Sequence, residues 1–181
     1  MEYADWGQVS GDLASTRRSA ALFLDNLPAD HNLWAISRRK WGATWRRIAD
    51  AHCQAADLNL KKRVFKEAVE AWLCALTALE VANRINDGDD PQAQDISAEV
   101  ALGIQRFGSS LERKIERTHI PCCDEPELPA YYLPAATTGI CTPTVICISR
   151  EEETGVALLG RLSPVVMGRS MSLLLISHED I

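Results

Sequence analysis

The chain offers few side chains suited to acid–base chemistry. Its only histidines are His31, His52, His119 and His178. An imidazole exchanges protons near neutral pH, and a tyrosine hydroxyl can help to orient a carbonyl or hydroxyl group. The candidate catalytic residues are His52, His119 and Tyr131. No spacing pairs them with a nucleophile, so they form a hypothesis for a step that needs only positioning and proton transfer.

Each candidate also has a plain structural interpretation. His52 lies on an apolar helical stripe, where a hydrogen-bonded core or cap histidine is the commoner finding. Tyr131 lies in a strand-like segment and is more often a packed residue than a ligand contact. His178 is followed by Glu179 and Asp180, which suggests a catalytic or metal cluster. The favoured interpretation of that trio is a polar, flexible terminus.

Four of the five tryptophans are spaced so that they could line an apolar ligand site. Trp34, Trp41 and Trp45 follow one another at helical spacing, with His52 further along the stripe and Trp72 on the next apolar helix. Indole rings give a large apolar area at a small rotamer cost, which suits a hydrophobic small molecule. Core packing is the commoner use of such a stripe and is the favoured interpretation.

Metal and cofactor sites are not indicated. Cys122 and Cys123 are adjacent, with no second pair at a zinc-ligand spacing. The acidic segment 86–91 lacks the spread of ligands and the closing glutamate of a calcium loop. We therefore expect no metal and no cofactor. The N-terminus shows no export signal, so we expect reduced thiols and a cytoplasmic location.

Composition limits the classes of partner. The chain has 181 residues, 46% of them hydrophobic, and a formal net charge of -6. This acidic balance argues against nucleic acid, because binding to phosphates needs clustered Lys and Arg. The basic segment 37–47 is interleaved with tryptophans and is interpreted as a solvated helix face. No apolar run approaches the roughly 18 residues of a membrane span, so we expect no membrane partner.

The elements that must position these residues begin with a helical region. Apolar residues recur at helical spacing through the first two-thirds of the chain. Asp12 is expected to cap the first helix and Pro28 to end it, and the second helix is expected to bend at Gly42. Val64 is expected to open the buried face of the third helix. The four predicted helices cover 12–27, 31 to at least 52, 60–85 and 95–117.

Strand-like segments replace the helical pattern after residue 117. Segments 118–121 and 128–133 flank an acidic turn and predict a β-hairpin. Segments 144–149 and 171–177 are apolar runs typical of strands buried on both faces, and the helix-like segment 152–162 lies between them. This last part predicts a βαβ unit with a parallel strand pair.

The predicted fold class is mainly α, with a small C-terminal α/β part. A helical domain over 1–117 is followed by a hairpin and a partial parallel sheet over 118–181. One βαβ unit is the smallest piece of a parallel sheet, and such sheets usually have several strands. We therefore expect the sheet to be incomplete.

Short sequence motifs within these elements resemble those of a known family. The pairs and runs concerned are Ile120-Pro121, Leu128–Leu133, Pro143–Ile146 and Glu152 or Glu153. They resemble α/β-hydrolases with a helical N-terminal cap, the family of dihydropseudooxynicotine hydrolase and bacterial esterase-like proteins. In that family a hairpin introduces the sheet, and a "PTVI" strand precedes the oxyanion loop, with a glutamate a few residues later.

The departures from this family concern its chemistry. Ser149-Arg150-Glu151 stands where the resemblance implies a glycine-rich oxyanion turn, and Ser177-His178-Glu179-Asp180 stands where it implies a D-G-P-G turn. No G-x-S-x-G nucleophile elbow occurs in the chain. We expect a truncated hydrolase-like protein that is non-hydrolytic alone and acts as a binding or assembly module or as part of a longer hydrolase.

One alternative function belongs to another class. The tryptophan-rich helical region could hold a hydrophobic small molecule and promote a lyase, cyclase or isomerase step. In either case an unpaired sheet edge is a template for association, so we expect a homo-oligomer or a complex with a second hydrolase chain. The resemblance adds that such family members are commonly dimers through the cap.

Overall fold

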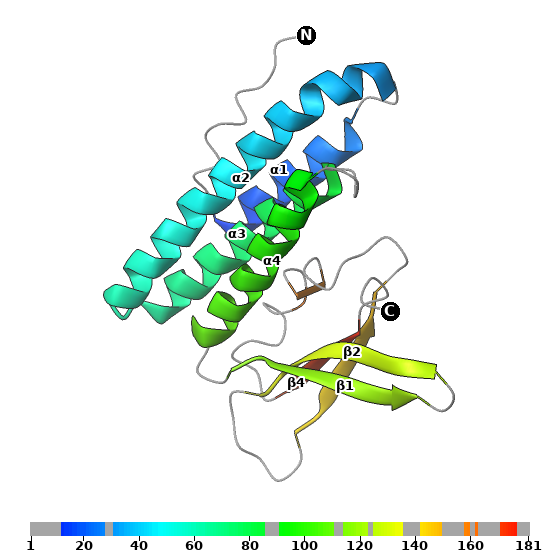
Figure 1. Ribbon diagram of the computed structural model, residues 1–181. Helices are drawn as coiled ribbons and strands as arrows, with labels where there is room; N and C mark the ends of the chain where they lie inside the picture. The colour runs from blue at the N-terminus through cyan, green and yellow to red at the C-terminus, as the bar shows by residue number, and fades with distance from the viewer. Residues whose placement is uncertain are drawn as a thin grey trace. The chain divides into compact units, whose positions relative to one another are not determined.

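The protein is described by a computed structural model that divides into two compact units, Met1–Ile104 and Gln105–Ile181. Its described part holds four helices followed by a mixed sheet of four strands, which confirms the predicted fold class (Figure 1). The domain boundary at residue 117 stays a prediction. The structure describes residues 12–27, 31–85, 91–110, 114–122, 125–135, 142–149, 158–159, 162 and 171–176.

The first helix, α1 (Leu13–Asp25), begins at the predicted cap. The Ser15 backbone N–H donates a hydrogen bond of 2.8 Å to Oδ1 of Asp12. This bond satisfies a donor that has no partner inside the helix, and it holds the pKa of the Asp12 carboxyl below its usual value. Ala20 and Phe23 lie on the buried face of α1. The predicted stop at Pro28 lies outside the described residues.

The second helix, α2 (His31–Lys61), is longer than its stripe predicts, and α3 (Phe65–Ile85) begins later than residue 60. α3 is buried along most of its length, because Ala, Leu and Val occupy most positions between residues 68 and 82. Four of the five predicted face residues are buried as expected: Ala68, Trp72, Leu76 and Leu79.

The turn between α2 and α3 explains why the predicted start of α3 is wrong. Arg63 has a φ of 59°, in the left-handed region that favours glycine. Its N–H donates to Leu60 O at 3.0 Å, and Val64 N–H donates to Asn59 O at 2.9 Å. These two bonds form a Schellman motif that ends α2. Val64 lies in this turn and is 38% exposed, so its predicted burial is also wrong.

The fourth helix, α4 (Pro91–Ser110), ends earlier than the predicted residue 117. Ile115 lies beyond the helix, and a Cβ placed on Gly108 would come within 3.2 Å of the Ile115 Cβ. The chain therefore passes close to the last turn of α4. Glu116 then enters the sheet, where it pairs with Tyr132. Periodicity predicts that Glu116 and Arg117 continue the helix, but pairing with β2 places them in a strand.

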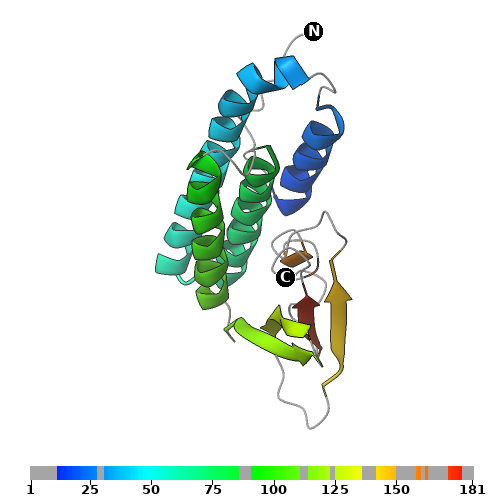
Figure 2. The same ribbon diagram turned by 45° about the vertical axis from the view of Figure 1, so that its right-hand side comes forward.

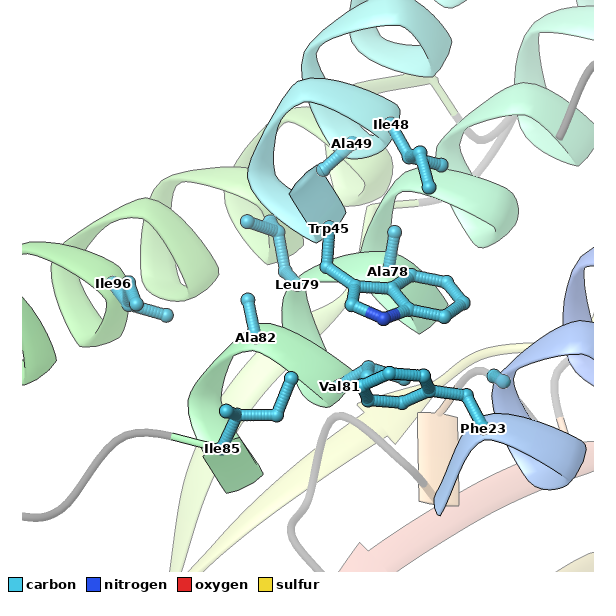
Figure 3. Close-up of a cluster of buried hydrophobic side chains, with 11 residues drawn as sticks. Phe23, Trp45, Ile48, Ala49, Ala78, Leu79, Val81, Ala82, Ile85 and Ile96 are labelled. Atoms are coloured by element: carbon cyan, nitrogen blue, oxygen red, sulfur yellow. The ribbon is translucent and has the colours of Figure 1, made fainter. Parts of the chain in front are cut away.

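The core of the first unit is built from all four helices. Figure 3 shows Phe23 of α1 and Trp45 of α2 lying against the small side chains of α3. Alanines on α3 allow the neighbouring helices to approach closely, and the aromatic rings fill the remaining volume. The buried cluster comprises Ala20, Phe23, Trp45, Ile48, Ala49, Ala78, Leu79, Val81, Ala82, Ile85 and Ile96.

The sheet has the strand order β1-β2-β4-β3. β1 pairs with β2 as the predicted antiparallel hairpin, β2 pairs with β4 antiparallel, and β3 pairs with β4 in parallel. The hairpin and the parallel pair are thus confirmed. The strands are β1 (Glu116–Cys122), β2 (Glu125–Leu133), β3 (Thr144–Ile148) and β4 (Ser172–Ile176).

The two predicted buried strands differ in the structure. β4 is central, and Leu173 and Leu175 are fully buried. β3 lies at the edge, where Ile146 is 61% and Ile148 is 63% exposed, so its predicted burial on both faces is wrong. Figure 2 shows β3 in gold at the outer edge of the sheet beside β4 in red. An apolar strand is buried only where neighbours cover it, and a sequence pattern does not supply neighbours.

The helix predicted over 152–162 lies mostly outside the described residues. Leu158 and Leu159 are described, are helical and are buried. The segments that carry Arg150, Glu152 and His178 also lie outside. Within the described part, no helix combines the length and the apolar character needed to cross a bilayer.

Candidate functional site

The tryptophans of α2 pack against α1. Phe23 meets Trp41 edge-on with ring centroids 5.7 Å apart, and it meets Trp45 with centroids 5.4 Å apart. Such edge-to-face contacts stabilise a core beyond the area they bury. Trp45 is 1% exposed and points into the helical core in Figure 3, while Trp41 is half-buried. These contacts agree with the favoured core interpretation, and a ligand role for the pair stays a prediction.

Trp72 is also 1% exposed, on α3. Its indole Nε1–H has no hydrogen-bond acceptor within the described part of the chain. The side chain of Trp34 lies outside the described residues, although its backbone belongs to α2. Trp41 and Trp45, two of the four tryptophans predicted to line a ligand site, therefore pack against the same α1 side chain, Phe23.

The three acid–base candidates are distributed over both units. His52 is half-buried on α2 in the first unit, whereas His119 on β1 and Tyr131 on β2 belong to the second. Tyr131 is opposite Arg117 and His119 is opposite Pro129, so both candidates lie on one face of the hairpin at diagonal positions. His119 is exposed and Tyr131 is half-buried. The hairpin thus brings two candidates together, and their catalytic role stays a prediction.

The described cysteines and acidic residues bear on two further kinds of site, a reactive thiol and a metal site. Cys53, Cys74 and Cys147 form no disulfide bonds. Burial raises the pKa of the Cys74 thiol, so this sulfur stays protonated and poorly nucleophilic at neutral pH. Among the described residues, no three His, Cys, Asp or Glu side chains gather as metal ligands would.

A buried hydroxyl of β4 forms a polar node that the sequence analysis missed. The Tyr132 hydroxyl and the Ala135 backbone N–H each donate a hydrogen bond of 3.1 Å to Ser172 Oγ. The Ser172 backbone N–H donates to Pro143 O at 2.9 Å. One residue thus ties together the exit of the hairpin, the start of β3 and the start of β4. None of these three partners is a base, so the bonds give Ser172 a structural role rather than that of an activated nucleophile.

An ion pair fixes α4 against α2 in the first unit. Arg46 Nε donates to Glu99 Oε2 at 3.1 Å, and Arg46 Nη2 pairs with Glu99 Oε1. This bidentate bond raises the pKa of Arg46 further above its usual value. Arg46 belongs to the basic segment 37–47, so at least this cation is used for packing within the chain.

β3 forms one edge of the sheet in the described part of the chain. β3 pairs with β4 on one side, and three of its apolar side chains, Val145, Ile146 and Ile148, are exposed. Residues paired in register project from the same face, so Ile146 and Ile148 lie with the half-buried Leu174 and Ile176 of β4. The ladder is anchored at its far end by the Ser149 N–H, which donates to Ile176 O at 2.9 Å. A well-formed apolar strand therefore stands at an edge of the sheet.

The comparisons with known proteins bear on the fold. No protein-family model and no curated protein sequence matches this chain. Among solved structures, the crystal structure of 2,6-dihydroxy-pseudo-oxynicotine hydrolase is similar, with a TM-score of 0.60 and 20% sequence identity. The match covers 87% of this chain and 44% of the hydrolase, so the chain spans less than half the length of the protein it matches.

This likeness agrees with the resemblance drawn from the hairpin and the "PTVI" strand. At 20% sequence identity, this likeness is evidence for the fold and not for the substrate. The helices followed by a mixed sheet account for most of the chain, and the matched protein is an α/β-hydrolase. In its fold, the chain therefore corresponds to part of an α/β-hydrolase.

Proposed function

We propose that this chain is an α/β-hydrolase-like module that does not hydrolyse esters by itself and functions by association. Its incomplete sheet is extended by further strands, supplied by the remainder of a longer hydrolase or by a second chain. The module contributes the helical unit and four strands, and its partner contributes the nucleophile.

The observation that carries this proposal is the edge strand β3. A five-residue strand with Ile146 and Ile148 exposed is a template for another strand, because its outer N–H and C=O groups are unpaired by the sheet described here. The partial match agrees with this, since more than half of the hydrolase lies outside the matched region. A parallel strand added at β3 would cover both the backbone edge and the isoleucines.

The chemistry of the chain supports the non-hydrolytic part of the proposal. An α/β-hydrolase presents its serine on a strained strand-to-helix turn, in the pattern G-x-S-x-G, and this pattern does not occur in the 181 residues. Ser172 is buried at the start of β4, with its hydroxyl held by Tyr132 and Ala135. Such a serine has neither the exposure nor the base that acyl transfer needs.

A fluorophosphonate probe tests the proposal directly, because it labels activated serines. We expect the 181-residue chain alone to show no labelling and no turnover of short-chain nitrophenyl esters above buffer. Ser172→Ala should leave both results unchanged. Stoichiometric labelling of any serine in the wild-type chain would overturn the proposal.

A further inference from the structure

The turn between α2 and α3 forms a cationic and apolar tip, which we define as residues 58–66. This segment contains four cations and no acid, in a chain whose formal net charge is -6. Asp57 and Glu67 stand at its two ends and limit the positive charge to the turn itself. The tip lies at one end of the helical unit, where α2 and α3 meet (Figure 1).

The apolar side chains of this tip are exposed. Leu58 is 51% and Phe65 is 58% exposed, and Val64 lies beside them. Single exposed apolar residues are ordinary, but three within eight residues of one helix–turn–helix connection indicate a binding surface. The Schellman bonds at Arg63 hold the backbone of this patch in one conformation.

The cations of the tip are not used within the described part of the chain. Arg46 on the same helix pairs with Glu99, whereas the tip cations have no ion pair among the described residues. All of them are exposed, and they surround Phe65 and Val64 in the sequence. They are Lys61, Lys62, Arg63 and Lys66.

We propose that the tip docks on an anionic lipid surface. The cations lie at the level of the lipid phosphates, and Phe65, Val64 and Leu58 enter the boundary between headgroups and acyl chains. Juxtaposed Lys and Arg are attracted to anionic leaflets, and apolar side chains beside them add the second signal that stable peripheral binding needs. Peripheral docking needs no membrane-spanning segment, so the tip could bind a membrane although the chain has no apolar run long enough to cross one.

Other occupants fit the tip less well. A second copy in a symmetric contact would place the same four cations against one another, and like charges oppose such an interface. An acidic protein surface would satisfy the cations but would leave Phe65 exposed unless it also offered an apolar pocket. A lipid interface offers both anionic headgroups for the cations and an apolar layer for Phe65.

Vesicle sedimentation tests this proposal with the full chain. We expect binding to phosphatidylcholine vesicles that contain phosphatidylserine, and little binding to phosphatidylcholine alone. Added salt should weaken the binding, because exposed charges are screened within roughly 8–10 Å at physiological ionic strength. Equal binding to both kinds of vesicle, or binding to neither, would overturn the proposal.

A charge variant separates the tip from other basic surfaces. Each Lys or Arg near an anionic leaflet is worth about fivefold in affinity, so Lys61→Gln with Lys62→Gln should weaken binding about 25-fold. Arg39→Gln with Lys40→Gln removes the same charge from exposed positions on α2, roughly 30 Å away along the helix axis. This control should change binding little, and an equal loss in both variants would contradict docking by the tip.

An apolar variant separates a lipid surface from the other occupants. Phe65→Ser should weaken vesicle binding about tenfold, while Leu102→Ser, at another exposed apolar position, should not. Binding that ignores Phe65→Ser and is competed by soluble polyglutamate would point to an acidic protein instead. A dimer in light scattering that is lost in Phe65→Ser would make the tip an interface between copies. Either result overturns the proposal.

Discussion

At the scale of single residues, the aromatic cluster of the first unit shows how similar side chains acquire different roles. Trp41 and Trp45 are one helical turn apart and both contact Phe23. Trp45 is almost inaccessible to solvent, whereas Trp41 stays half-buried at the margin of the core. Replacing a ring in a closed environment leaves a cavity that its neighbours fill only partly, and replacing one at the margin leaves less.

We therefore predict that Trp45→Phe lowers the free energy of unfolding by about 2 kcal/mol, and that Trp41→Phe lowers it by about 1 kcal/mol or less. Urea unfolding followed by circular dichroism measures both. The alternative of a lyase, cyclase or isomerase pocket gives a different pattern. In that case one substitution would leave stability nearly unchanged and would weaken binding of an aromatic ligand.

The polar node at Ser172 is a residue-scale feature that no sequence pattern announces. Its partners Tyr132 and Ala135 come from the end of the hairpin, and Pro143 comes from the approach to β3. Their meeting depends on the register of three strands, which periodicity does not fix. The candidate residues His119 and Tyr131 could be chosen by type, but their common face was visible only once β1 and β2 were paired.

At the scale of elements, periodicity predicted which segments are helices and strands, and it failed where a tertiary feature decides a boundary. The cap at Asp12 was predictable because a side chain next to the helix creates it. The break between α2 and α3 at residues 62–64 was not predictable, because Arg63 occupies the left-handed position that is usually glycine at the end of a helix. The exposure of β3 was not predictable either, since it depends on which strands lie beside it.

The left-handed position between α2 and α3 gives a prediction at this scale. A non-glycine residue at positive φ carries a strain of about 1 kcal/mol, so Arg63→Gly should raise the free energy of unfolding by up to that amount. Lys61→Gly, in the last turn of α2, should lower it by about 0.5–1 kcal/mol. Chemical unfolding of both variants provides the test. Destabilisation by Arg63→Gly would show that the arginine side chain makes a contact worth more than the strain.

At the scale of the whole molecule, β3 forms an edge of the sheet in the described part of the chain, and this edge leads to a prediction about association. An apolar edge strand with nothing beside it promotes association, and proteins that avoid this place lysines on their edges. Here the edge carries Ile146 and Ile148 instead. The edge on which we propose that further strands dock is also a surface through which copies of this chain could associate.

We predict that the isolated chain self-associates at micromolar concentration and that Ile146→Lys reduces this association without lowering the melting temperature. The isoleucine is exposed, so its replacement removes little buried area from the monomer. Leu22→Lys introduces the same charge at an exposed position on α1 and should not change association. Light scattering over a concentration series measures the effect. A wild-type chain that is monomeric throughout would contradict the prediction.

The strand order also dictates a sequence of events during synthesis on the ribosome. β2 pairs with β4, and the Tyr132 and Ser172 partners are separated by 40 positions in the chain. The hairpin and β3 are therefore both synthesised before β4, the strand that joins them. Until β4 has been synthesised, β2 and β3 each keep an edge that β4 does not yet pair. α1, α2 and α3 find their partners among themselves much earlier in translation. Because long-range pairing forms slowly, we expect the nascent sheet, rather than the helices, to be the part of this chain most prone to aggregate during synthesis.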